Sequence, residues 1–194
     1  MSSRRRFLGR AGLLATSAAW WRAAEVFAAA RTEELIPRDL FFVRPDYQSV
    51  QLSPDGTRIA YLAPANGILN VFVAPVSAPR AGRQVTRVTD RDVSFFIRWA
   101  YDNRHIVFFR ERDGDENWRA SSVDTQTGAV TVLTPEVGVR ALVQEVSHLF
   151  PSEMLLRHNA RDRRYHDLYR VNVETGASQL VFENNEFAWR TAPR

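Results

Sequence analysis

The chain of 194 residues contains no cysteine and no lysine, and the first absence excludes several kinds of site. Without cysteine there is no disulfide framework, no thiolate metal site and no lipidated cysteine anchor. Without lysine, all 26 basic residues are arginine. No sustained helical period of apolar residues occurs beyond the first 30 residues, so the sequence does not predict helical domains. What remains is a succession of short apolar segments separated by turn residues.

The net charge of +4 is unevenly distributed. Five arginines lie within the first 30 residues, where Glu25 is the only acidic residue. From Arg31 onward, 21 arginines are matched by 21 aspartates and glutamates, so this part is formally neutral. A nucleic-acid-binding protein needs a basic patch on its folded domain. We therefore expect no nucleic-acid partner.

Residues 1–30 have the three parts of a secretory signal: a positive start, a short apolar middle and small residues at the end. The start matches the twin-arginine export motif at Arg4, Arg5, Phe7 and Leu8. The apolar run over 11–21 is shorter than the roughly 20 residues that span a bilayer, which disfavours a membrane helix. Ala28 and Ala30 form a small-x-small cleavage site. We expect export to the periplasm or medium, without a stable membrane anchor.

A unit of 47 to 48 residues recurs along the rest of the chain. Residues 55–61 align with 102–108 at an offset of 47, and residues 123–128 align with 171–176 at an offset of 48. Repeats of about 40–50 residues built from short strands are typical of β-propeller blades. A β-sandwich would explain the short strands but not the repeat. Because propellers have about 4–8 blades, this chain has room for only part of a ring.

The predicted fold is therefore all-β: a partial β-propeller of about three four-stranded blades, preceded by the signal segment. A lead-in covers residues 31–49, and the incomplete propeller covers 50–194. The blades are predicted at 50–92, 93–140 and 141–183, with the start of a fourth at 184–194.

Two turns and three strands define the expected first blade, with the first two of these strands at 59–62 and 71–76. Ser53–Gly56 and Asn66–Gly67 are predicted hairpin turns, because each supplies glycine where a positive φ is needed. The alternating segment 84–89 is expected to be the strand that closes this blade.

Asp102 and His105 could begin a Ser–His–Asp triad. The chain has no G-x-S-x-G nucleophile elbow, however, and His105 lies within a predicted strand. A polar strand residue is the favoured interpretation. We expect no catalytic residue and no cofactor in this chain.

Asp113, Asp115 and Asn117 have the 1-3-5 spacing of a calcium loop. Trp118 stands where that loop needs glycine, and Asp124 stands where it needs glutamate, so a solvated hairpin loop is favoured and no metal is expected.

The remaining polar and aromatic residues have structural interpretations. His148, His158 and His166 lack zinc-site spacing and are interpreted as scattered polar positions. Residues 161–164 form a charge cluster between two predicted strands and are interpreted as a solvated turn. Packing between blades, rather than base stacking, is expected of Trp99, Trp118, Trp189, Phe95, Phe96, Phe108 and Phe109.

The order of several motifs carries a family resemblance. SPDGTRIAYLAP (53–64), NVFVAPV (70–76), the hairpin WAYD (99–102), RDGDEN (112–117) and VDTQTG (123–128) together resemble the N-terminal propeller of the prolyl oligopeptidase family. The resemblance is strongest to its acylaminoacyl-peptidase and dipeptidyl-aminopeptidase branches. It implies a propeller that admits small peptides to a serine-hydrolase domain, with peptides as substrates of the full-length parent. It also implies that further blades and that hydrolase domain are the natural intramolecular partners. Under this resemblance the loop over 113–117 would face the substrate cavity, and its carboxylates could attract a peptide N-terminus, a hypothesis that replacement of Glu116 tests.

An alternative remains open. Ser-Pro-Asp-Gly also occurs in Tol-associated periplasmic propellers, which would make this chain a non-enzymatic binding module for a protein or glycan. Either way, three blades leave open faces and strand edges, so we expect the isolated chain to be poorly soluble, oligomeric or partly unfolded.

Overall fold

The computed structural model describes residues 36–43, 45–94, 96–135 and 137–186. The chain divides into two units, Met1–Arg44 and Pro45–Arg194. The described part of the first unit contains one turn of 3-10 helix, η1 (Arg38–Phe41). Across the described ranges, no helix has the length and apolar character needed to cross a bilayer. The predicted signal residues, Arg4, Arg5, Phe7, Leu8, Ala28 and Ala30, lie outside the described residues, as do Phe95 and Trp189.

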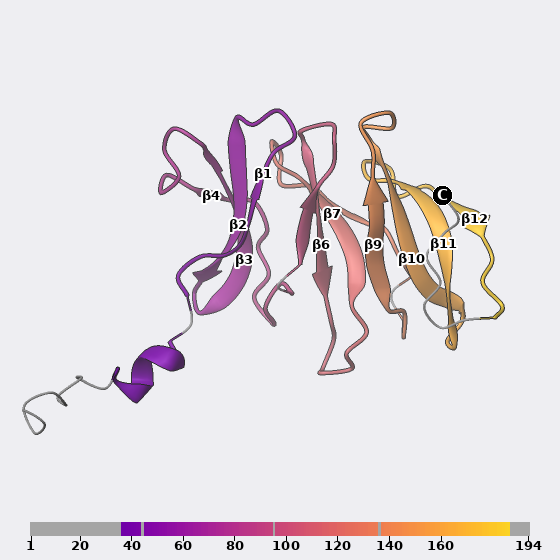
Figure 1. Cartoon of the computed structure of the whole chain (residues 1–194), viewed down its shortest axis with the longest axis horizontal. Helices are drawn as coiled ribbons and strands as arrows, with labels where there is room; N and C mark the ends of the chain where they lie inside the picture. The colour runs from indigo at the N-terminus through magenta and orange to yellow at the C-terminus, as the bar shows by residue number, and fades with distance from the viewer. Residues whose placement is uncertain (1–35, 44, 95, 136, 187–194) are drawn as a thin grey trace, which may run out of the picture. The chain divides into compact units, whose positions relative to one another are not determined.

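The second unit consists of three four-stranded antiparallel sheets, labelled in Figure 1. The first sheet contains β1 (Gln48–Leu52), β2 (Arg58–Ala65), β3 (Ile68–Pro75) and β4 (Arg83–Gln84). The second contains β5 (Ile97–Trp99), β6 (His105–Arg110), β7 (Arg119–Asp124) and β8 (Val130–Val132). The third contains β9 (Ala141–Val146), β10 (Glu153–Asp162), β11 (Tyr165–Asn172) and β12 (Ser178–Phe182). The predicted three four-stranded sheets are confirmed.

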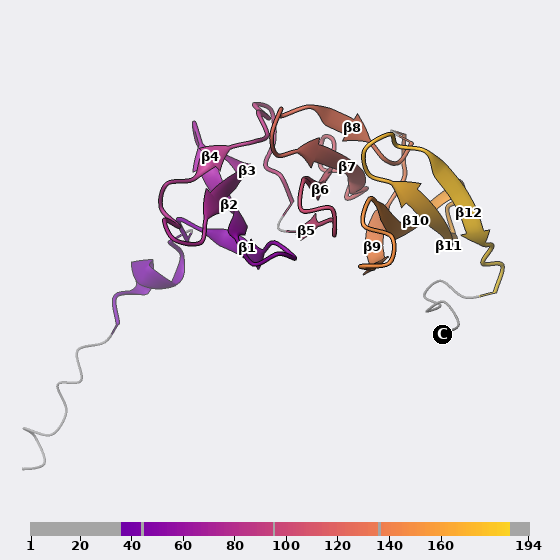
Figure 2. The ribbon, with the colours of Figure 1, turned by 90° about the horizontal axis from the view of Figure 1, so that it is seen from above.

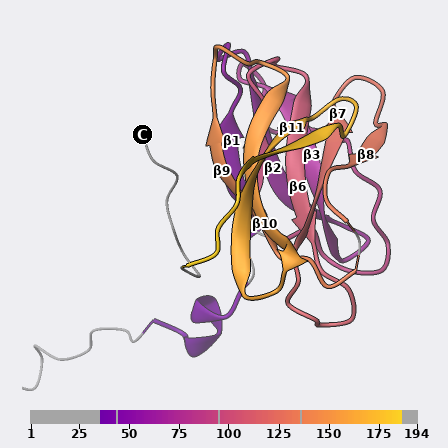
Figure 3. The same cartoon turned by 90° about the vertical axis from the view of Figure 1, so that its right-hand side faces the viewer.

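Each sheet is a meander, because its strands are neighbours in chain order. Within this unit the sheets follow one another face to face (Figure 2). The first strands β1, β5 and β9 lie on one side of the row, and the last strands β4, β8 and β12 lie on the other. The end-on view shows the same separation, with β1 and β9 opposite β8 (Figure 3). This is the radial order of propeller blades.

The predicted turns form as their residues require. Asn66 and Gly67 both have positive φ, 52° and 82°, as a two-residue type I′ hairpin demands, and β2 pairs with β3 without a register shift. The 48-residue offset is visible in the turns before β8 and β12. The Gly128 N–H donates to the carbonyl of Asp124 at 2.8 Å, and the Gly176 N–H donates to that of Asn172 at 2.9 Å.

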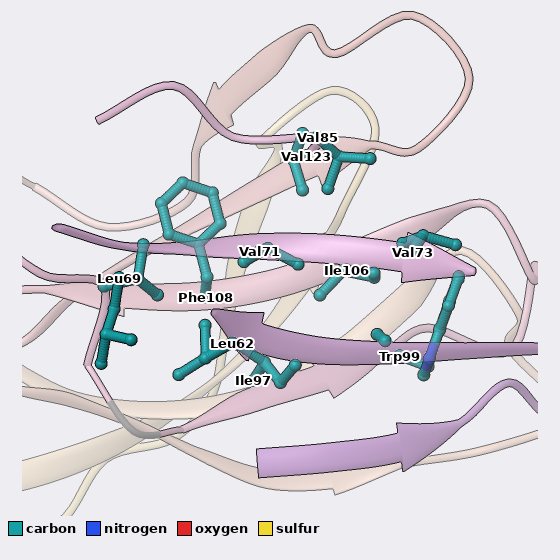
Figure 4. Packing of buried hydrophobic residues seen from close by; sticks show 12 residues of the cluster. Leu62, Leu69, Val71, Val73, Val85, Ile97, Trp99, Ile106, Phe108 and Val123 are labelled. Carbon is teal, nitrogen blue, oxygen red and sulfur yellow. The ribbon is translucent and has the colours of Figure 1, made fainter. Parts of the chain in front are cut away.

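Apolar side chains at alternating strand positions form one core between each pair of sheets. Between the first two sheets, Leu62 and Val71 pack with Ile97 and Ile106 (Figure 4). Between the second and third, residues including Val107 and Leu156 form the equivalent cluster. Burial of these faces stabilises the fold by roughly 25 cal/mol for each Å² of apolar surface that is removed from water. The cores are therefore shared by neighbouring sheets and do not belong to single sheets.

Two sequence-based expectations about the core were wrong. The strand predicted over 84–89 is paired only at Arg83–Gln84. Beyond it, the side chain of buried Asn70 replaces the ladder: its Oδ1 accepts hydrogen bonds from Thr86 Oγ1 (3.0 Å) and from the Val88 N–H (2.9 Å). Phe96, predicted as packing between blades, is 51% exposed, whereas Trp99 and Phe108 are buried as predicted.

Candidate functional site

A cavity of about 760 Å³ opens beside the β6–β7 loop and the linker between the first two sheets. Its volume lies within the range of about 300–1,000 Å³ that is usual for ligand pockets. The lining residues are Gln48, Leu69, Arg91, Asp92, Val93, Ser94, Glu111, Gly114, Glu116 and Trp118.

The linker side of this cavity is held by hydrogen bonds to both sheets. Asp92 Oδ1 accepts the N–H of Leu69 at 2.7 Å, and the Val93 N–H donates to the Leu69 carbonyl at 3.0 Å. The next residue, Ser94, donates its N–H to the carbonyl of Phe109 in β6 at 2.8 Å. The linker is therefore bonded to β3 and to β6, which fixes the cavity wall.

The β6–β7 loop is organised by its own carboxylates. Glu111 forms an ion pair with Arg91, and its second oxygen accepts the N–H of Glu116 at 3.1 Å. Asp115 Oδ1 accepts the N–H of Arg112 at 3.2 Å and that of Asn117 at 3.1 Å. Desolvation of Asp115 opposes ionisation, but these backbone hydrogen bonds prevail and hold the pKa of Asp115 below its usual value.

Three residues of this loop have left-handed backbone conformations. The φ angles are 54° at Asp113, 76° at Gly114 and 53° at Glu116. Glycine adopts such angles freely and aspartate tolerates them, but a glutamate there is uncommon. Strained conformations of this kind cluster at binding sites, because surrounding contacts must maintain them. The strain therefore marks Glu116, which lines the cavity, as a candidate ligand-binding residue.

The charges of the lining favour a cationic ligand. Three carboxylates, those of Asp92, Glu111 and Glu116, face one arginine, Arg91. Asp92 is bonded to a backbone N–H and Glu111 to Arg91, whereas no ion pair of Glu116 occurs among the described residues. The lining is therefore suited to binding an amine.

The calcium-loop residues are not assembled as a metal site. Asp113, Asp115 and Asn117 are not among the residues that line the cavity, and Asp115 is bonded to the loop backbone and to Arg119. Within the described ranges, no three Asp, Glu or His side chains are placed to hold a metal ion.

The Asp102–His105 pair is structural. His105 lies in β6, as predicted, with 5% of its surface exposed. Its Nδ1 is 2.6 Å from Asp102 Oδ2, while Asp102 Oδ1 accepts the N–H groups of Arg104 and His105. The carboxylate thus closes the β5–β6 turn, and no serine takes part in these contacts.

Pairing within the third sheet refines two interpretations of its polar residues. His158 and His166 lie on the neighbouring strands β10 and β11, and the His158 ring stacks on Tyr169 at 3.9 Å, but within the described ranges neither belongs to a group that could hold a metal ion. Arg163 and Arg164 form the exposed turn that was predicted between the two strands, whereas Arg161 belongs to β10 and forms two hydrogen bonds, of 2.7 and 2.9 Å, with the fully buried Asp167. Pairing across the hairpin brings together residues that are separated in sequence.

Several lining residues escaped the sequence analysis. Gln48 and Leu69 are distant in sequence from the β6–β7 loop, and only the blade-to-blade contact brings them to it. Arg91 and Asp92 belong to a charged run, residues 90–92, which was the available signal for a functional linker.

Two curated proteins are similar to this chain. Dipeptidyl aminopeptidase BIII of Pseudoxanthomonas mexicana is 36% identical over 152 residues, which cover 78% of this chain and 22% of that protein. Dipeptidyl peptidase family member 6 of Caenorhabditis elegans is 31% identical over 163 residues, covering 80% and 22%. The chain thus spans about a fifth of the length of each relative. No family model matches the sequence.

Solved structures share the fold. The β-propeller domain of the Trilobed protease from Pyrococcus furiosus superposes with a TM-score of 0.52 at 15% identity, covering 72% of this chain and 44% of that one. TolB from Acinetobacter baumannii superposes with a TM-score of 0.50 at 19% identity, covering 70% and 32%. At these identities the structures support the propeller fold alone. The more similar curated sequences are those of peptidases.

Proposed function

This chain belongs to the prolyl oligopeptidase family as a portion of its N-terminal propeller, and we propose that it admits peptides to the hydrolase domain of an exported serine peptidase. The observation that carries the proposal is the 36% identity with a dipeptidyl aminopeptidase across 152 residues. No G-x-S-x-G elbow occurs in this sequence, so the nucleophile belongs to the proposed hydrolase domain. Further blades and that domain are the proposed partners.

The cavity beside the β6–β7 loop is the proposed contact with substrate. Its excess of carboxylates attracts the protonated amine at a peptide N-terminus, and Glu116 is the carboxylate with no ion pair among the described residues. Hydrogen bonds to charged groups contribute about 1.5–3 kcal/mol. The propeller therefore selects short peptides with a free amine, while the chemistry of hydrolysis takes place elsewhere.

The test compares Glu116→Gln with the unaltered sequence in the complete polypeptide that carries this propeller portion. We expect KM for a dipeptidyl chromogenic substrate with a free amine to rise about 10- to 100-fold, with kcat little changed. Glu174→Gln, which alters an exposed glutamate between β11 and β12, is the matched control and leaves KM unchanged. An N-acetylated substrate should be insensitive to both substitutions. Unchanged KM in the Glu116 variant would remove the proposed amine contact, and absence of any peptidase activity would remove the proposed function.

A further inference from the structure

A second cavity, of about 520 Å³, lies between the outer parts of the first and second sheets. We name it the arginine cleft, because Arg83, Arg87 and Arg110 line it together with Val130 and Val132. Among the described residues that line it there is no aspartate or glutamate, whereas the cavity beside the β6–β7 loop has three. The two cavities therefore attract ligands of opposite charge.

The three arginines are held in different ways. Arg83 donates from Nη2 to the carbonyl of Thr125, which ties the first sheet to the second. Arg110 forms an ion pair with Asp90, which is 73% exposed at its side chain, and its buried Nε has no hydrogen-bond partner among the described residues. Arg87 is exposed and has no ion pair within the described ranges. Arg87 therefore remains available to a ligand, and at Arg110 a ligand carboxylate would replace the exposed Asp90 as ion-pair partner.

The cleft exists because the closing strand of the first blade is short. The ladder of β4 stops after Gln84, and the hydrogen bonds of Asn70 then draw the chain toward β3. The facing strand β8 is left with Val130 and Val132 at 53% and 51% exposure. Apolar walls and positive charges thus share one groove.

The placement of the charges indicates an extended ligand. Arg87 lies beyond the end of β4, and Arg110 ends β6, so the two charges come from different sheets. A volume of about 520 Å³ also exceeds what a single ion fills. Valine walls suit aliphatic side chains better than sugar rings. An extended peptide that alternates acidic and aliphatic residues satisfies all three conditions.

We propose that the arginine cleft binds an extended acidic segment of a partner protein, with its carboxylates on Arg87 and Arg110 and its aliphatic side chains against Val130 and Val132. Arginine suits this contact because its planar guanidinium binds carboxylates through two parallel hydrogen bonds. This site is separate from the proposed peptidase function and does not rest on it.

The test measures fluorescence anisotropy of a fluorescein-labelled hexapeptide of alternating glutamate and valine, titrated with the full chain. We expect binding that weakens as salt is raised, and a loss of affinity of at least about tenfold in Arg87→Glu. Arg98→Glu, at an exposed arginine of β5, is the matched control and should change affinity less than twofold. A peptide with glutamine in place of glutamate should not bind.

Three results would overturn the proposal. The first is equal affinity of the unaltered chain and the Arg87 variant, and the second is equal binding of the glutamine peptide. The third is displacement of the labelled peptide by polyphosphate at concentrations lower than those that the unlabelled peptide needs, combined with loss of polyphosphate binding in Arg87→Glu. That combination would assign the cleft to a non-peptide polyanion instead.

Discussion

Asp55 shows how one carboxylate fixes a turn that the repeat then reuses. Its Oδ1 accepts hydrogen bonds from Ser53 Oγ at 2.6 Å and from the N–H of Thr57 at 3.0 Å. These bonds favour the ionised form and lower the pKa of Asp55 to about 2. Asp102 closes the equivalent turn 47 residues later, where its Oδ1 accepts hydrogen bonds from the N–H groups of Arg104 and His105. In the first two blades, an aspartate therefore closes this turn.

His158 makes the stability of the third sheet dependent on pH. Burial lowers its pKa to about 4 from an ordinary value of 6.5, although the charge of Asp167 opposes this, and nearby His166 lowers it further. Because the unfolded chain takes up this proton first, stability is complete above pH 6.5 and declines as pH falls toward 4. We predict a loss of about 2 to 3 kcal/mol over that interval, measured by denaturant unfolding at a series of pH values.

The matched variant is His158→Phe, which keeps a ring against Tyr169 but removes the titrating group. We expect its unfolding free energy to vary much less between pH 6.5 and 4. An equally steep dependence in this variant would assign the effect to His166 or to another group.

At the scale of elements, Arg58 joins the first two sheets. Its guanidinium lies 5.2 Å from the centre of the Trp99 ring, and it donates to the Asn103 carbonyl and, at 3.4 Å, to Thr125 Oγ1. We predict that Arg58→Ala lowers the free energy of unfolding by about 1–3 kcal/mol, because packing and hydrogen bonds across the sheets are lost together. Arg98→Ala should stay within about 0.5 kcal/mol. Equal effects of the two substitutions in thermal or denaturant unfolding would contradict this role.

The elements were predictable where local chemistry decides them. Asn66–Gly67 predicts its hairpin because only certain residues accept two positive φ angles in succession, and the offset between Gly128 and Gly176 predicts equivalent turns. The shortness of β4 was not predictable, because it depends on the side chain of Asn70, which binds a segment 16 to 18 residues away. The cavity beside the β6–β7 loop was anticipated only at Glu116, since its other wall comes from the contact between blades.

The N-terminal segment gives a prediction at the same scale. Replacing Arg4 and Arg5 with lysine should leave the precursor in the cytoplasm, because twin-arginine export depends on the paired arginines. Arg10→Lys with Arg22→Lys is the matched control, with the same change of residue type outside the motif. Cell fractionation measures the outcome, and undiminished export of the Arg4/Arg5 variant would contradict the proposed signal.

At the scale of the whole molecule, the sheets expose apolar side chains that neighbouring blades would cover in a ring. Leu149 and Phe150, beside the third sheet, are 69% and 49% exposed, and Val50 and Leu52 in β1 are 59% and 58% exposed. Exposed apolar clusters and open edges promote association. We predict concentration-dependent oligomers of the isolated chain in size-exclusion chromatography with light scattering.

Leu149→Ser with Phe150→Ser should reduce this association, whereas Val137→Ser, at a 78% exposed position between β8 and β9, should not. A monomer with a sharp cooperative melt at all concentrations would show that three blades are sufficient by themselves.

The most direct test of the peptidase assignment is to label the natural protein with a fluorophosphonate, a reagent that is specific for activated serines. The protein is first isolated through an affinity tag placed in the exposed turn between β11 and β12. The account predicts a labelled protein several times heavier than the 22.2 kDa of this chain, because the chain spans 22% of its peptidase relatives. A tagged protein that carries these blades but takes up no label would contradict it.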